Sequence, residues 1–211
     1  VMGSEGRGEQ LLKTDQDNGL VLRDGYVCSV DLAEVCQQFS AALADFGYPP
    51  CPGNIMVSNP HWRQSVSDFS QMVRLWSVTA NPDSLMELAI FLDAHAVCGD
   101  TTLLEQVRGA VFDLTSGNDA MLARFASAIN FFGSSQGWWN RLLALGDKDG
   151  EQLDLKKIGT FPLVHGVRSL ALANHLTEVT TTGRIEALAA AGKLPHKLAA
   201  DLIDSLHFFM G

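Results

Sequence analysis

The sequence lacks long apolar runs and an excess of basic residues, and each absence excludes a class of protein. No uninterrupted apolar stretch approaches the roughly 18 residues that a membrane-spanning helix needs. The N-terminal residues are glycine-rich and acidic, whereas a secretory signal peptide is basic and then apolar. Lys and Arg number 15 against 24 Asp and Glu, which gives a formal net charge of −9. Nucleic acid is therefore not the expected partner, because neutralising its phosphates requires a basic face.

Cysteine is also scarce, and its spacing predicts no zinc site. The 4 cysteines form no C-x-x-C pair, and none lies beside a histidine at zinc-ligand spacing. We therefore expect reduced, structural thiols in a cytoplasmic protein. The 46% hydrophobic and 18% charged residues fit a globular protein with a substantial core, and 211 residues suffice for one domain or for two of about 100 each.

The first 19 residues hold the most informative pattern. A glycine-rich stretch contains Gly3, Ser4 and Gly6, and the pair Asp15 and Asp17 follows it. If the chain runs extended from Asp15 into the β-type apolar run that follows, both carboxylates point to one face, about 7 Å apart. Such a pair can share hard divalent cations, and Mg²⁺ usually lies between carboxylates and a substrate phosphate. Because backbone N–H groups and the Ser4 hydroxyl suit that phosphate, the pattern predicts phosphoryl or nucleotidyl transfer.

Other phosphate and metal motifs do not fit this stretch. A Walker loop ends in Gly-Lys-Ser/Thr, but here Gly8 is followed by Glu9. The glycines are spaced G-x-x-G-x-G, whereas the dinucleotide fingerprint requires G-x-G-x-x-G. An EF-hand that began at Asp15 would need Asp or Asn at its fifth position and Gly at its sixth, where the sequence has Gly19 and Leu20.

The motif GSxGRxE followed by TDxDN resembles the DNA polymerase β-type nucleotidyltransferase superfamily. More narrowly, the sequence is similar to bacterial nucleotidyltransferases that carry cyclic-nucleotide-binding and CBS domains, relatives of the uridylyltransferase that modifies the PII signalling protein. Three later segments extend the resemblance over nearly the whole chain. They are CPGxxMxSNPxW at residues 51–62, DLKxxGxxPxVxxxR at residues 154–168 and TxxR at residues 181–184.

The resemblance implies a site of three carboxylates that hold Mg²⁺ or Mn²⁺. These are Asp15, Asp17 and Asp93. Asp93 interrupts the apolar run Leu88–Val97, where a buried carboxylate costs several kcal/mol unless it is paired or binds a metal. The family pattern F-x-D-x-R occurs here as FLDAH, with histidine where the family usually has arginine. The alternative for Asp93 is a buried salt bridge, to Arg7 or Arg63.

The resemblance also implies nucleotide and phosphate ligands on both sides of a cleft. These are Gly3, Ser4, Gly6, Arg7, Lys156 and Arg168. Arg7 has an alternative, which is to anchor Glu9 or Asp17. Lys156 and Arg168 also have an alternative role, which is to pair with Asp154 inside their own domain.

The apolar periodicity predicts mainly helices. Helices are expected at residues 6–12, 31–46, 82–87, 101–114, 119–129, 162–173, 184–191 and 195–209, with another from residue 59 to residue 76. Strands are expected at residues 20–22, 54–57 and 88–97. We interpret Asp31 as a helix N-cap that forms a capping box with Glu34, and Asn59 as a helix N-cap rather than a substrate ligand. Trp62 and Trp76 are interpreted as core residues.

These elements predict an α+β fold. A small nucleotidyltransferase α/β domain, with a mixed sheet and flanking helices, is followed by an all-α helical bundle domain. Residues 116–118 are the expected linker, so residues 1–116 form the catalytic domain and residues 117–211 a helical domain of the substrate-binding type. Only two residues precede Gly3, where the superfamily has a strand. We therefore expect the chain to be part of a longer protein with attached regulatory domains.

The predicted reaction is metal-dependent transfer of a nucleoside monophosphate from an NTP to an acceptor, with release of pyrophosphate. The resemblance to the PII uridylyltransferase makes a protein acceptor plausible by analogy, and no residue identifies the acceptor or the base. One alternative is a non-catalytic nucleotide-binding regulatory module of a larger signalling protein. Another is a protein-interaction module without turnover, and detection of pyrophosphate separates the enzyme from both.

Overall fold

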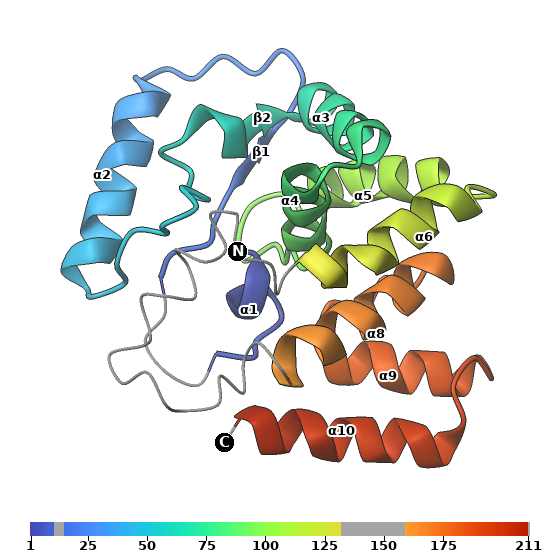
Figure 1. Ribbon diagram of the computed structural model, residues 1–211. Helices are drawn as coiled ribbons and strands as arrows, with labels where there is room; N and C mark the ends of the chain where they lie inside the picture. The colour runs from blue at the N-terminus through green and yellow to red at the C-terminus, as the bar shows by residue number, and fades with distance from the viewer. Residues whose placement is uncertain (11–14, 132–158, 211) are drawn as a thin grey trace.

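The computed structural model describes residues 1–10, 15–131 and 159–210 of the chain (Figure 1). In chain order the elements are α1 (Gly3–Gly6), β1 (Leu20–Leu22), α2 (Leu32–Asp45), η1 (Pro60–Trp62), β2 (Arg63–Ser65), α3 (Val66–Thr79), α4 (Pro82–Leu92), α5 (Thr102–Thr115), α6 (Asp119–Ser127), η2 (Ala128–Phe131), α8 (Phe161–Ala173), α9 (Thr181–Ala190) and α10 (His196–Met210). Helices α8, α9 and α10 stack in sequence at one end of the molecule (Figure 1). The described chain is mostly helical, which agrees with an α+β fold that has little sheet.

The sheet of the described residues is a parallel pair rather than the mixed sheet expected from the sequence. Leu20 of β1 lies opposite Arg63 of β2, and Leu22 lies opposite Ser65. The chain between the two strands contains α2, which provides the long connection that a parallel pair requires. The strand predicted at residues 54–57 is a turn segment instead, and β2 follows it.

The predicted strand at residues 88–97 is wrong, because residues 88–92 belong to helix α4 and residues 93–97 form no strand. The Asn81 side chain caps this helix by accepting from the Ser84 N–H, and Pro82 occupies its first turn. Leu88, Ala89, Ile90 and Phe91 are all buried, so the helix is apolar around most of its circumference. A short buried helix and a buried strand give the same continuous apolar run, and periodicity does not separate them.

The other helices lie close to their predicted positions, and two have the predicted caps. The Asp31 side chain accepts from the backbone N–H groups of Ala33 and Glu34 at the start of α2. Asn59 is confirmed as an N-cap, although the helix it caps is the short η1, and α3 begins only after Ser65.

The short helix expected at residues 6–12 lies earlier, at Gly3–Gly6. It ends at Arg7 because the next residue, Gly8, has a φ of 65°, which lies outside the helical region. Residues 11–14 lie outside the described part of the chain.

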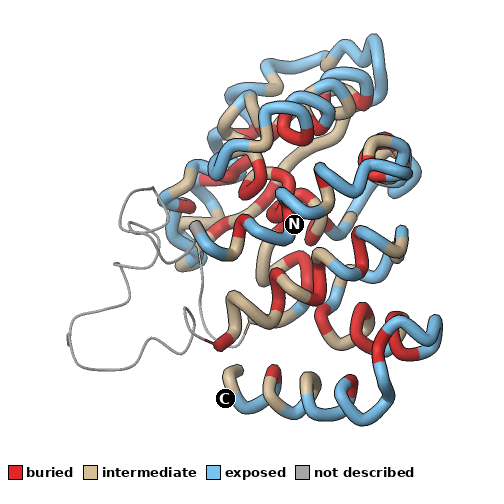
Figure 2. Tube along the Cα trace, turned by 45° about the vertical axis from the view of Figure 1, so that its right-hand side comes forward, coloured by how far each residue is buried: buried red, intermediate tan, exposed pale blue. Residues whose placement is uncertain are grey.

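The main hydrophobic core joins η1 and helices α3 to α6. Trp62 and Trp76 are 2% and 3% exposed, and their ring centroids are 5.7 Å apart, which confirms that both are core residues. The same core includes Phe125 of α6, so apolar packing continues across the predicted linker. A second, smaller cluster joins α8, α9 and α10, and buried segments run through the middle of the molecule (Figure 2). Within the described residues, no helix combines the length and apolar character needed to cross a membrane.

Candidate active site

The two carboxylates of the opening motif converge as predicted. From Asp15 to Asn18 the side chains alternate, with Asp15 and Asp17 partly exposed and Gln16 and Asn18 buried. Side chains of an extended chain alternate in this way, although regular strand pairing begins only at β1. One potential ligand atom from each of Asp15, Asp17 and Cys51 lies within 4.8 Å of the others.

The chemistry of these three groups fits a hard divalent cation held by the two carboxylates. Carboxylate oxygens are the ligands that Mg²⁺ and Mn²⁺ prefer, whereas a thiol binds metals only as the thiolate and then favours softer ions. Burial, followed by the charge of Asp17, raises the pKa of the Cys51 thiol far above its usual range. Cys51 is therefore a neutral neighbour of the pair, which sequence reasoning had treated only as part of the CPG segment.

Helix α1 begins directly against the carboxylate of Asp17. Gly3 has a φ of 58°, and a Cβ atom at this position would lie 2.7 Å from Asp17 Oδ2. The Met2 N–H donates to the Asp17 backbone oxygen at 2.9 Å, which fixes the two segments side by side. Both the conformation and the close approach require glycine at position 3. Ser4 follows within α1, so these two predicted phosphate ligands lie beside the carboxylate pair.

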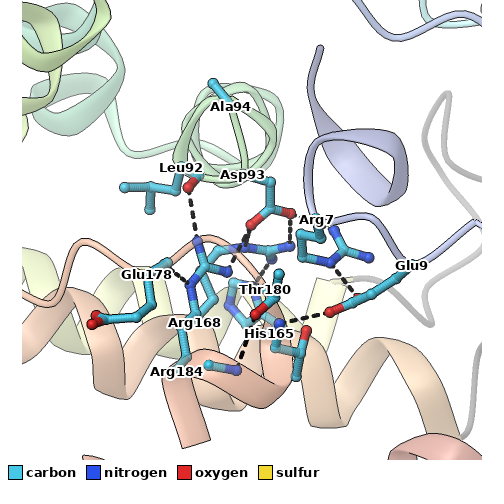
Figure 3. A network of polar contacts seen from close by, with 12 residues as sticks. Arg7, Glu9, Leu92, Asp93, Ala94, His165, Arg168, Glu178, Thr180 and Arg184 are labelled. Atoms are coloured by element: carbon cyan, nitrogen blue, oxygen red, sulfur yellow. Dashed lines mark hydrogen bonds and ion pairs between the residues drawn. The ribbon is translucent and has the colours of Figure 1, made fainter. Parts of the chain in front are cut away.

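Asp93, the third predicted carboxylate, lies in a different cluster. It follows the last residue of α4, is 0% exposed and is surrounded by guanidinium groups (Figure 3). Its Oδ1 atom accepts from Arg168 Nε at 2.9 Å and from Arg184 Nη1 at 2.8 Å. Its Oδ2 atom accepts from Arg7 Nη1 at 2.5 Å and also from Arg168 Nη2. We call Arg7, Glu9, Asp93, Arg168 and Arg184 the arginine cluster.

The charges of the cluster keep Asp93 ionised although it is buried. Burial alone would raise the pKa of Asp93, but Arg168, Arg7 and Arg184 together lower it well below its usual range. The structure therefore gives Asp93 the salt bridge that was the alternative to metal binding. Of the two arginines expected as alternative partners, Arg7 forms a salt bridge with Asp93, whereas Arg63 donates to the Val57 backbone oxygen. Both Asp93 oxygens accept from guanidinium groups, and in the described part of the chain Asp93 is not among the residues whose ligand atoms converge with Asp15 and Asp17.

Arg7 and Glu9 of the glycine-rich stretch also belong to this cluster. Arg7 Nε donates to Glu9 Oε2 at 2.6 Å, so the structure shows the anchoring alternative for Arg7. Glu9 Oε1 accepts from the backbone N–H of Thr181, the first residue of α9, at 2.6 Å. A Cβ atom on Gly6 would lie 2.1 Å from the Asp93 backbone oxygen, so this glycine permits close backbone packing.

The second half of the chain contributes the remaining predicted and unpredicted site residues. Arg168 binds Asp93 across the molecule, and its alternative partner Asp154 lies outside the described residues together with Lys156. Glu9 was expected only as an alternative partner of Arg7, and no role was expected for Arg184. Arg184 could have been suspected from the TxxR segment, whereas the sequence gives no sign of the bond from Glu9 to α9.

A buried histidine contacts the arginine cluster through Arg168. His165 is 1% exposed, and its Nε2–H donates to the Phe125 backbone oxygen at 2.8 Å. With that tautomer its Nδ1 atom faces Arg168 Nη1 at 3.4 Å as an acceptor. Burial, followed by the charge of Arg168, lowers the pKa of His165 to about 4. The ring is therefore neutral at physiological pH and accepts from the arginine.

Two family models match the chain. Residues 1–83 match the model described as "Putative nucleotidyltransferase DUF294", and residues 119–211 match "Putative nucleotidyltransferase substrate binding domain". No curated protein and no solved structure matches the chain. The carboxylate pair lies within the first matched range, whereas Arg168 and Arg184 lie within the second.

Proposed function

Because the two matches support assignment of the chain to a nucleotidyltransferase family, we propose that it transfers a nucleoside monophosphate from an NTP to an acceptor and releases pyrophosphate. The observation that carries this proposal is the convergence of Asp15 and Asp17 beside the start of α1. Carboxylates supply metal ligands, and the adjoining glycine-rich turn supplies backbone donors for phosphate oxygens. The two requirements of nucleotidyl transfer thus meet at one place.

In this proposal Asp15 and Asp17 hold Mg²⁺ or Mn²⁺. A bound metal would neutralise charge on the triphosphate and lower the pKa of the attacking hydroxyl. Ser4 and the backbone around Gly3 bind the phosphates. The role of Lys156 as a phosphate ligand stays a prediction from the sequence. Asp93 holds the arginine cluster together, and its use as a third metal ligand would first require release from three guanidinium groups.

The acceptor is proposed to bind the second half of the chain. This rests on the description of the family model that matches residues 119–211, which names a substrate-binding domain. A protein acceptor, regulatory domains elsewhere in a longer chain and a cytoplasmic location stay predictions from the sequence.

The second candidate is a nucleotide-binding regulatory module without turnover. One observation favours it, which is that both oxygens of Asp93 accept from arginines and Asp93 is not in the described group of Asp15, Asp17 and Cys51. A module of this kind would bind an NTP with its metal through Asp15 and Asp17 but would form no pyrophosphate.

The experiment is a calorimetric titration of ATP and UTP with and without Mg²⁺. Wild type is compared with Asp15→Asn and with Asp201→Asn, a matched change of an exposed residue on α10. We expect metal-dependent binding in wild type and Asp201→Asn and its loss in Asp15→Asn. A pyrophosphate assay on the same samples, with candidate acceptors, then separates the enzyme from the regulatory module. Absence of binding by folded wild type contradicts both candidates.

A further inference from the structure

The residues that alternate with the two carboxylates, Gln16 and Asn18, are buried amides that hydrogen-bond to other segments of the chain. Gln16 is 2% exposed and Asn18 is 7% exposed. Burying an amide is unfavourable unless its polar atoms are hydrogen-bonded, so such residues usually have defined partners. Here the partners lie in α2 and in the segment Tyr48–Val57, which carries Cys51.

Gln16 holds the start of that segment. Its side-chain Nε2 donates to the backbone oxygens of Ser40 and Tyr48, at 2.9 Å each. Its backbone N–H donates to the Pro49 oxygen at 3.0 Å. One glutamine therefore ties the extended chain to α2 and to the first two residues of the segment.

Asn18 holds the other end of the same segment. Its Oδ1 atom accepts from the Val57 N–H at 2.9 Å, and its backbone N–H donates to the Ile55 oxygen at 3.0 Å. Gln16 and Asn18 thus fasten both ends of Tyr48–Val57. The middle of the segment places Cys51 within 4.8 Å of the carboxylate ligand atoms.

We propose that Gln16 and Asn18 are positioning residues for the metal site formed by Asp15 and Asp17. The inference rests on the proposed function, since it concerns the metal affinity of that site. Two carboxylates within 4.8 Å repel one another when no cation is present, and the extended chain would relieve this by turning one of them away. Anchoring Gln16, which lies between the two carboxylates, and Asn18, which follows them, prevents the turn, so the pair is preorganised for the cation.

The test measures Mn²⁺ affinity by electron paramagnetic resonance, which needs no turnover. Wild type is compared with Gln16→Leu and Asn18→Leu, which keep the approximate side-chain size and remove the hydrogen bonds. Asn81→Ala is the control, because it removes a side-chain hydrogen bond at the start of α4, on another element. Circular dichroism establishes that each variant is folded.

We expect Mn²⁺ to bind roughly 10- to 100-fold more weakly to each leucine variant, as when partners that orient metal ligands are removed, and unchanged to Asn81→Ala. Wild-type affinity in both folded leucine variants overturns the inference and leaves the metal site intact. Failure of wild type to bind Mn²⁺ overturns the metal site and the inference together.

A second measurement uses the wild-type protein alone, so it does not depend on whether the leucine variants fold. Metal binding and the anchoring of Tyr48–Val57 are thermodynamically linked if the inference is correct. Saturating Mg²⁺ is therefore expected to slow hydrogen exchange at the Val57 amide, which donates to Asn18. An exchange rate that does not change while Mg²⁺ binds overturns the inference.

Discussion

Replacing Asp93 with asparagine tests whether the arginine cluster stabilises the fold. The substitution keeps the shape of the side chain but removes its charge and one of its two acceptor oxygens. Three arginines, each at most 9% exposed, would then lose Asp93 as a counter-ion, and Arg7 would keep Glu9. Removing one partner of a buried ion pair costs about 3–5 kcal/mol, a large part of the roughly 5–15 kcal/mol that stabilises a typical domain.

The loss is large enough to measure by urea and thermal unfolding. For a chain of this size about 1 kcal/mol lowers Tm by roughly 2–4 °C, so we expect a decrease of about 10 °C. Asp100→Asn is the matched control, because Asp100 pairs with Arg23 at 2.8 Å on the surface, where that arginine side chain is 66% exposed. Water and salt screen the exposed pair, and its loss is expected to change Tm far less.

The result that refutes this reasoning is equally specific. If Asp93→Asn unfolds like wild type but no longer binds Mg²⁺, the carboxylate acts at the metal and the arginine contacts do not dominate its role. If Asp93→Asn is destabilised and a folded sample at low temperature still binds Mg²⁺, the stabilising role is confirmed.

Two further predictions concern local geometry and pH. Gly3→Ala is expected to lower stability and metal affinity more than Gly8→Ala. Both glycines have a positive φ, but only a Cβ atom at position 3 would approach Asp17. Urea unfolding and Mn²⁺ titration of the two variants measure the difference. His165 has a pKa near 6.5 when unfolded and about 4 when folded, so only the unfolded state gains its proton as the pH falls between these values. The contribution of His165 to the free energy of unfolding is therefore complete above pH 6.5 and decreases by about 3 kcal/mol as the pH falls to 4. The free energy of unfolding, measured at several pH values, should depend less steeply on pH in His165→Gln than in wild type.

The features that the sequence predicted correctly depend on neighbouring residues. Alternation between Asp15 and Asn18 needs only an extended chain, and the caps at Asp31 and Asn59 need only the next three residues. The carboxylate pair was therefore predictable in both composition and direction. The first part of helix α4 was predicted at residues 82–87, whereas its last turn was not, since Leu88 to Phe91 are all buried and show no polar face.

The sequence suggested only two pairs of the arginine cluster, Arg7 with Asp93 and Arg7 with Glu9, because the other members are distant in the chain. Asp93 lies 86 residues from Arg7 and 91 from Arg184, and Glu9 lies 172 residues from Thr181. Whether a buried carboxylate binds arginine or a metal depends on which of these groups the fold brings within reach. The local pattern FLDAH is compatible with either outcome.

The distribution of charge in the arginine cluster restricts how the two halves of the chain can be separated or exchanged. Arg7, Glu9 and Asp93 together carry a net charge of −1, whereas Arg168 and Arg184 carry +2. A fragment that ended near residue 118 would expose the Asp93 carboxylate without two of its cations, and the complementary fragment would carry two arginines without an anion. The halves should therefore reassemble when mixed, and chimaeras between relatives should fold only when both parents supply matching charges. Although two family models divide the chain, the ion pairs of this cluster join the two matched ranges through Asp93.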